Sequence, residues 1–374
     1  MSFVALSSVR HRVRIGLPLP FGVLDADGQL LLNKGYMLEN DDRLTTLCSR
    51  GSLVLLEELE SDARHAPDRS TQRRTKALES WAACSNRLSA VLTEADQPHF
   101  RAALDEASTP VLDLIARDPD LAILQSMRRE RGGRVQHALR HSIHSAIATR
   151  LVAERLGWDV SATVSTFKAA LTMNLSVMEL QGELAGSRLP PSAEQRRRLH
   201  EHPVRSRELL EQAGVTDRDW LLAVEQHHEL PDGTGYPRGS SDINDKARLI
   251  RMADIYCAKL DTRITRQGVM PDRAARELFA RDPANPMMQA LVKEFGLYPP
   301  GTFVRLASGE AGIVVKRGAT VLAPLVAALT WRSGQPRSEP LRRDTSQAAF
   351  KVLKSLGPEE VRVGVSLESL TAIH

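Results

Sequence analysis

The stretch HHELPDGTGYP, residues 227–237, carries the most specific pattern in the chain. Successive residues of a helix point about 100° apart, so two adjacent histidines can bind one ion only where the helix ends in a loop. The two glycines of DGTG permit positive φ and a close approach of the backbone to a ligand, and the final proline stiffens the end of the loop. A DGTG turn alone is common at protein surfaces, whereas adjacent histidines before it and an ADIY segment after it form a far more specific combination. The stretch therefore predicts a metal or phosphate site beside a rigid loop.

Histidines are concentrated before and within this stretch. Seven of the eleven histidines lie between His137 and His228, where packing alone would need few of them. His137, His141 and His144 are spaced at i, i+4 and i+7, so they fall along one face of a predicted helix. Taken alone, this triplet is better explained as a solvated polar face, and His202 in its His-Pro pair is unremarkable.

The region around these histidines has the period of amphipathic helices. Apolar residues recur at spacings of three and four, as in Leu139, Ile143 and Ile147. We therefore predict an all-helical domain over residues 76–298. A linker is expected over residues 61–75, because this segment has almost no apolar residue.

Both flanks predict small modules that contain strands. Over residues 1–60, short apolar runs alternate with turn signals such as ADGQ, and Asn40 is placed to cap a short helix that Gly51 would end. Over residues 299–374, the segment VRLASGEAGIVVKRG predicts a hairpin with a Ser-Gly turn, and VRVGVSL near the end predicts another strand. The expected fold class is mainly α, with an all-helical domain between small β-containing N- and C-terminal modules.

Composition excludes several classes of protein. The 374 residues are 42% hydrophobic and 26% charged, which is typical of a folded soluble chain. A net charge of +4 gives no case for nucleic acid or a membrane surface as a partner, and no apolar stretch is long enough to span a bilayer. The three cysteines are far apart and form no CxxC pair, so we expect neither disulfides nor a thiolate zinc site. A cytoplasmic protein without a membrane span is predicted.

In these motifs the chain resembles the HD-GYP family, bacterial metal-dependent phosphohydrolases of the HD superfamily that hydrolyse cyclic di-GMP. The resemblance covers roughly residues 136–298. It implies five metal ligands: His141, His202, His227, His228 and Asp254. It also implies that a loop contacts a ligand or partner through Asp232, Gly233, Gly235, Tyr236 and Pro237. Two arginines that follow the loop, Arg263 and Arg266, are implied at the same site. The usual Pro-Tyr between those arginines is replaced here by Ile-Thr.

The chain departs from the family at the motif that gives it its name. A segment reading approximately AALLHDIGK in the family is AALTMNLSV here, so Met173, Asn174 and Val177 replace its histidine, aspartate and lysine. The aspartate bridges two cations about 3.5–4 Å apart, and neutral Asn174 cannot offset their repulsion. The Met173 thioether is a poor ligand for the hard ions of hydrolytic centres, and Val177 removes a cation that would neutralise phosphate charge. We therefore expect hydrolysis to be weak or absent.

Two hypotheses for the metal remain open. His202, His227 and His228 could hold one divalent ion (Zn, Fe or Mn), with His141 and Asp254 nearer the vacated second position; alternatively, the histidines are relics that bind nothing. If an ion binds, its affinity should fall below about pH 6, since unperturbed imidazoles have pKa values near 6.5.

Two functional hypotheses follow from the degenerate motif. The first is a binding or scaffolding role in signalling, with cyclic di-GMP or a signalling protein as partner and little or no hydrolysis. The alternative is an active phosphodiesterase that hydrolyses cyclic di-GMP to linear pGpG or GMP. Related HD scaffolds that lack the GYP loop fit less well, because DGTGYP is intact. The sequence carries no signal for the oligomeric state.

Overall fold

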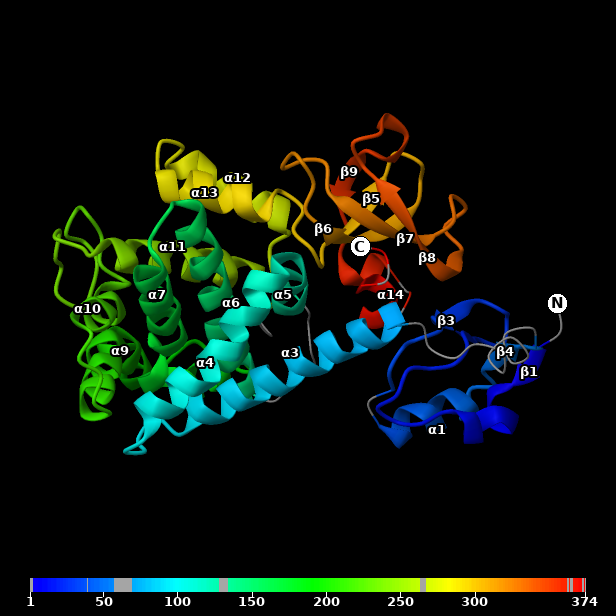
Figure 1. The fold of residues 1–374 in the computed structure, drawn as a ribbon, viewed down its shortest axis with the longest axis horizontal. Helices are drawn as coiled ribbons and strands as arrows, with labels where there is room; N and C mark the ends of the chain where they lie inside the picture. Colours follow the sequence, from blue (N-terminus) through cyan, green and yellow to red (C-terminus); the bar gives the residue numbers. More distant parts are fainter. Residues whose placement is uncertain are drawn as a thin grey trace. The chain divides into compact units, whose positions relative to one another are not determined.

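The computed structural model describes residues 3–38, 40–56, 69–127, 134–262, 267–361, 363, 366–371 and 373. The fold is mainly α, as predicted, with small sheets near both ends of the chain (Figure 1). Two compact units are present: a helical unit, Trp81–Leu297, and a second unit formed by Met1–Ser80 together with Tyr298–His374. No described helix is both long and apolar enough to cross a membrane.

The helical unit is built around α6 (Arg134–Arg155), which packs against α7, α8, α11 and α13. Its helices, the first of which begins before the unit, are α3 (Arg69–Thr93), α4 (Phe100–Arg117), α5 (Pro119–Met127), α6, α7 (Val160–Thr172), α8 (Met178–Ala185), α9 (Ala193–Gln212), α10 (Arg218–Gln226), α11 (Asp245–Leu260), α12 (Pro271–Arg281) and α13 (Pro286–Phe295), with a 3-10 turn η3 (Leu175–Val177) between α7 and α8. Helix α3 begins inside the predicted linker, and residues 57–68 lie outside the described part.

The starts of the helices near the histidines follow from local capping. The Asp217 side chain accepts a hydrogen bond from the backbone of Trp220 and so fixes the start of α10. Ser192 and Gln195 form a reciprocal capping box at the start of α9. Asn244 caps α11 by accepting from the Lys246 amide. These caps fix where α9, α10 and α11 begin.

The N-terminal module contains β1 (Phe3–Ala5), η1 (Leu6–Arg12), β2 (Val23–Leu24), β3 (Leu30–Leu32), α1 (Asp41–Ser49) and β4 (Leu53–Leu55). Its sheet has the order β1-β4-β2-β3. The predicted cap is confirmed, because the Asn40 side chain accepts from the backbone of Arg43 at 2.9 Å. Gly51 follows the helix with φ of +72°, which glycine adopts without strain.

The C-terminal module contains β5 (Phe303–Leu306), β6 (Ala311–Lys316), β7 (Leu325–Thr330), β8 (Pro336–Asp344), η4 (Ala348–Phe350), β9 (Val352–Ser355), η5 (Pro358–Glu360) and α14 (Leu367–Thr371). The sheet has the order β8-β7-β6-β5-β9. Strands β5 and β6 form the predicted antiparallel hairpin, with Gly309 at φ +87° in its turn. The strand expected over 361–367 falls partly on residues outside the described part, and Leu367 begins α14 instead.

Candidate metal centre

Three histidines, from α9 and from the end of α10, lie close together where these two helices meet. Helix α10 stops at Gln226, His227 is its C-terminal cap residue and His228 follows in the departing chain. His202 lies inside α9. One potential ligand atom from each of these histidines lies within 4.8 Å of the others, and this is the one such group found in the described part of the chain.

The hydrogen bonds of two rings leave their lone pairs facing each other. Nδ1 of His202 donates to the Leu199 carbonyl and Nδ1 of His227 donates to the Val224 carbonyl, both at 2.6 Å. A carbonyl only accepts, so the proton sits on Nδ1 and each Nε2 is an acceptor. The two Nε2 atoms are 3.2 Å apart. Ligands at 2.0–2.1 Å in a tetrahedral zinc site are separated by about 3.3 Å. Two lone pairs at this distance fit a shared cation, so the residues present match one bound metal ion.

Burial keeps the three imidazoles neutral. Desolvation, together with the neighbouring His227, lowers the pKa of His202 to about 3. Desolvation lowers the pKa of His227 and places the pKa of His228 well below its ordinary value. The negative charge of Asp254 raises the pKa of all three rings, against the effect of burial, so this carboxylate lies near them. Because neutral imidazole is the form that binds metals, the cluster is ready for an ion well below neutral pH.

His141 is held in a different way, between two carboxylates. Its Nε2 lies 2.8 Å from Asp254 Oδ1, and its Nδ1 lies 2.8 Å from Asp261 Oδ2. Burial alone would lower the pKa of His141, but the hydrogen bonds to Asp254 and Asp261 outweigh it and raise the pKa to about 10. An imidazolium that donates from both nitrogens has no lone pair for an ion. The structure thus pairs His141 with Asp254 and does not bring His141 into the histidine cluster.

The polar face suggested by the histidine triplet in α6 is not solvated. His141 is 8% exposed and His144 is 3% exposed, so the interpretation as solvated histidines is wrong for both. Burial lowers the pKa of His144 to about 4, so this ring is neutral. Asp261 was not expected from the sequence, although it lies seven residues after Asp254 and therefore two helical turns further along one face.

The segment that replaces the family motif packs closely and brings no charge. Met173, Asn174 and Val177 are all at most 2% exposed. Ser176 ties the segment to α9, because its hydroxyl donates to the His202 carbonyl at 3.1 Å. No carboxylate from this segment can offset a second cation, so the residues present fit one ion and not two.

The buried carboxylate of Glu229 fixes the loop that follows the histidines. Glu229, 1% exposed, accepts from the backbone of Arg238 at 2.7 Å and of Ser240 at 3.0 Å. Gly233 has φ of +75°, and a Cβ on Gly235 would lie 2.5 Å from Cα of Glu229, so neither position accommodates a side chain without a shift. The backbone around the DGTGYP loop is therefore held by Glu229, the residue that directly follows His227 and His228.

The Tyr236 ring covers the cluster. It stacks on His228 with ring centroids 4.6 Å apart and on His200 at 4.9 Å. Arg251, which the sequence analysis did not single out, is half-buried, and its charge acts on Asp232, Tyr236 and Asp254. Its position three residues before Asp254 could have indicated it, because residues three apart lie on the same face of a helix. Pro237 ends the loop, and Arg263 and Arg266 lie outside the described residues.

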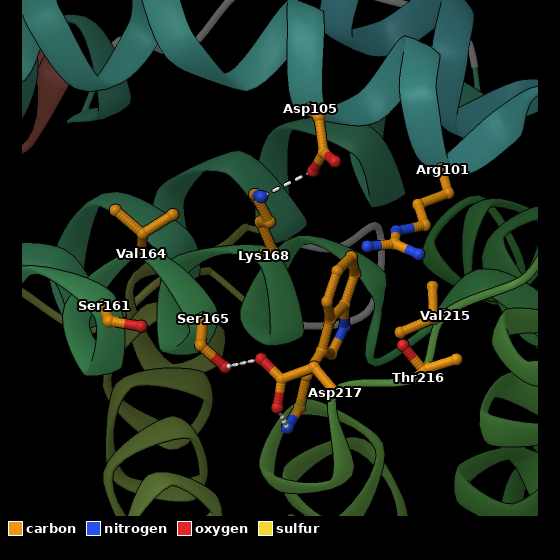
Figure 2. Close-up of a pocket in the computed structure, with 10 residues that line it drawn as sticks. Arg101, Asp105, Ser161, Val164, Ser165, Lys168, Val215, Thr216 and Asp217 are labelled. Carbon is orange, nitrogen blue, oxygen red and sulfur yellow. Dashed lines mark hydrogen bonds and ion pairs between the residues drawn. The ribbon is translucent and has the colours of Figure 1, made fainter.

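A separate cavity of about 160 Å³ lies beside the N-terminal half of α7. Figure 2 shows Lys168 of α7 directed toward Asp105 of α4, and Ser165 toward Asp217 at the start of α10. The indole N–H of Trp220 donates to the Thr172 hydroxyl at 2.9 Å. These polar groups already have partners. Their contacts fix the end of α7, and with it the substituted motif, against α10, the helix that ends at His227.

Comparison with known proteins shows a match to a family model: residues 113–282 match the model of the HD domain. A cyclic di-GMP phosphodiesterase of Pseudomonas aeruginosa is 37% identical over 107 residues, which are 27% of this chain and 25% of that protein. The match thus spans about a quarter of the curated relative. A solved structure from Bdellovibrio bacteriovorus, titled an HDG"Y"P protein, has a TM-score of 0.49 at 19% identity and covers 78% of this chain and 97% of that one. The HHE and DGTGYP motifs lie within the residues that match the HD domain model.

Proposed function

We propose that the helical unit is a one-metal HD-GYP domain that binds cyclic di-GMP and hydrolyses it little or not at all. The observation that carries the proposal is the contrast between the two halves of the site. One half offers neutral imidazole nitrogens, and the other holds a protonated imidazole between two carboxylates. The ligand is taken from the activity of the Pseudomonas aeruginosa relative.

A second ion is disfavoured by charge. To ligate, His141 would have to give up a proton that its hydrogen bonds to Asp254 and Asp261 stabilise. The negative charge that a bridging aspartate would provide is missing at Asn174. Both effects act against two-metal hydrolysis of a phosphodiester.

The remaining residues suit binding. Three neutral nitrogen ligands favour zinc or a similar borderline ion over magnesium, and such an ion polarises a phosphate oxygen when it is bound. Arg251 adds a positive charge beside the DGTGYP loop, where it would offset a phosphate. Tyr236 presents an aromatic ring at the same place, which suits contact with a base.

Slow phosphodiesterase activity is the second candidate, and it rests on one observation. Asp254 is an ionised carboxylate close to the histidine cluster, since its charge acts on the pKa values of all three rings. A carboxylate in this place could take up a proton from an attacking water.

The test measures binding and turnover in the same samples. The purified chain with zinc, manganese or iron is titrated with cyclic di-GMP by calorimetry, and linear product is followed by chromatography. We expect saturable binding that the His228→Ala variant weakens, without product. A turnover of about 1 per second or faster would establish the enzyme instead. Absence of binding to the metal-loaded chain would remove cyclic di-GMP as the ligand and leave a protein partner.

A further inference from the structure

The C-terminal module has a groove of about 450 Å³ that belongs to neither the metal centre nor the cavity beside α7. It lies where the β7–β8 turn, strand β8 and the 3-10 turn η4 face the start of β6. Its charged and aromatic lining is Glu310, Trp331, Arg332, Arg337, Arg343 and Phe350.

The charges of this lining are unequal. Three guanidinium groups, of Arg332, Arg337 and Arg343, face one carboxylate, Glu310, so the lining carries an excess of two positive charges. Glu310 is 4% exposed at its side chain and accepts from Nη2 of Arg337 at 2.9 Å and from Nε and Nη2 of Arg343 at 2.9 and 2.8 Å. The buried carboxylate therefore holds two guanidinium groups in fixed positions rather than neutralising the groove.

Of these two arginines, Arg343 keeps donors for a ligand at a partly exposed side chain, whereas Arg337 is only 7% exposed. Each guanidinium has five N–H groups in a planar fork. The Arg337 fork donates to Thr330 and Glu310, and the Arg343 fork donates twice to Glu310, so four bonds engage four of ten donors. The remaining N–H groups of Arg343 match the oxygens of a phosphate.

Aromatic rings lie among the cations. The Arg337 guanidinium stacks 3.7 Å from the centroid of the Trp331 ring, and that of Arg343 lies 4.5 Å from the centroid of Phe350. Trp331 nevertheless remains 52% exposed. An exposed indole beside fixed guanidinium groups is a platform on which the planar ring of a base can stack.

We propose that this groove binds a purine nucleotide, with the base on Trp331 and the phosphate at Arg332 and Arg343. The volume of about 450 Å³ suits one or two bases rather than a long strand. The ligand chemistry is shared by mononucleotides and by a cyclic dinucleotide. The inference is independent of the metal centre, because none of its residues lies in the helical unit.

The test uses the full chain carrying His228→Ala, so that the proposed ligand site of the helical unit is impaired. Binding of GMP, cyclic di-GMP and inorganic phosphate is measured separately by calorimetry. Because the chain has four tryptophans, the second readout is the part of the tryptophan fluorescence that Trp331→Ala removes. We expect at least one nucleotide to bind and to quench the fluorescence, and phosphate alone to bind at least tenfold more weakly. Trp331→Ala and Arg332→Ala, both at exposed positions, should each weaken nucleotide binding about tenfold or more.

Arg342→Ala is the matched control. Arg342 is exposed on the same strand and next to Arg343 but does not line the groove, so its removal should change affinity less than twofold. Three results would overturn the inference: no nucleotide binds, Arg342→Ala weakens binding as much as Arg332→Ala does, or phosphate binds as tightly as GMP. A single-stranded oligonucleotide that binds far more tightly than either nucleotide would also overturn it.

Discussion

Zinc should stabilise the helical unit through His202, His227 and His228, and the effect can be calculated. An ion that binds only the folded state adds about 2.7 kcal/mol when its concentration is 100 times the dissociation constant. For a unit the size of Trp81–Leu297, 1 kcal/mol shifts Tm by about 2–4 °C, so zinc should raise Tm by about 5–11 °C. Differential scanning calorimetry with and without zinc measures this shift. His228→Ala removes one of three ligands and should abolish most of it.

The control for this experiment is His99→Ala. His99 is an exposed imidazole at the start of α4 whose side chain makes no capping hydrogen bond, so its removal should leave the zinc shift unchanged. Equal shifts in wild type and His228→Ala, or no shift in either, would refute the reasoning and favour relic histidines.

The pH dependence adds a second criterion to the same experiment. The folded pKa values of His202, His227 and His228 lie below the unfolded value near 6.5, so the folded rings have fewer protons to release when zinc binds than unperturbed imidazoles would have. The zinc shift should therefore persist below the limit near pH 6 expected from unperturbed imidazoles. The metal-free chain behaves oppositely: the three rings gain protons only on unfolding, so its stability should fall as the pH drops below 6.5. A zinc shift that vanishes between pH 6 and 5.5 would show that the rings are not held neutral.

Further predictions concern the second half of the site and the loop. Restoring Met173→His with Asn174→Asp supplies a ligand and a bridging charge, so metal content per chain should rise; unchanged content in elemental analysis would show that the pocket no longer accepts a second ion. Asp261→Asn removes one carboxylate from a buried ion pair, which costs about 3–5 kcal/mol. The pKa of His141 is raised to about 10, so the contribution of His141 to the free energy of unfolding is full below about pH 6.5 and is lost as pH rises through 10. The pKa of Asp261 is lowered to about 2, so the contribution of Asp261 is lost as pH falls from 3.8 through 2. Urea denaturation should accordingly show the largest gap between wild type and Asp261→Asn at about pH 4–6.5, and a gap that widens toward pH 10 would be inconsistent with this account. Gly235→Ala places a Cβ against the backbone of Glu229 and should cost about 1–3 kcal/mol in the same assay, whereas an unchanged midpoint would mean that the loop is free to move.

Features set by neighbouring residues could be predicted from the sequence. Two adjacent histidines that both bind one ion require a helix end, and α10 ends at Gln226. The Asn40 cap and the hairpin around Gly309 were also predicted, because capping and turn formation depend on a few successive residues. The convergence of His202 with the later pair rested on a family resemblance rather than on spacing.

Features that depend on tertiary packing were not predictable in this way. The bond between His141 and Asp261 joins residues 120 positions apart, and it depends on how α6 packs against α11. The family resemblance put His141 and Asp254 near one metal position, and the structure brings them within 2.8 Å of each other; the contact of the other His141 nitrogen with Asp261 was not predicted. The arginine and aromatic groove of the C-terminal module was missed for the same reason, since the pairing of β7 with β8 brings Arg343 and Trp331 to one groove.

The number of metal ions per chain tests the central claim most directly. The chain is loaded with excess zinc, freed of unbound ion by gel filtration and analysed for metal and protein by elemental analysis. One ion per chain is expected, because three neutral imidazoles converge while His141 is held as a cation and Asn174 carries no charge. Two ions per chain, or none, would contradict the account.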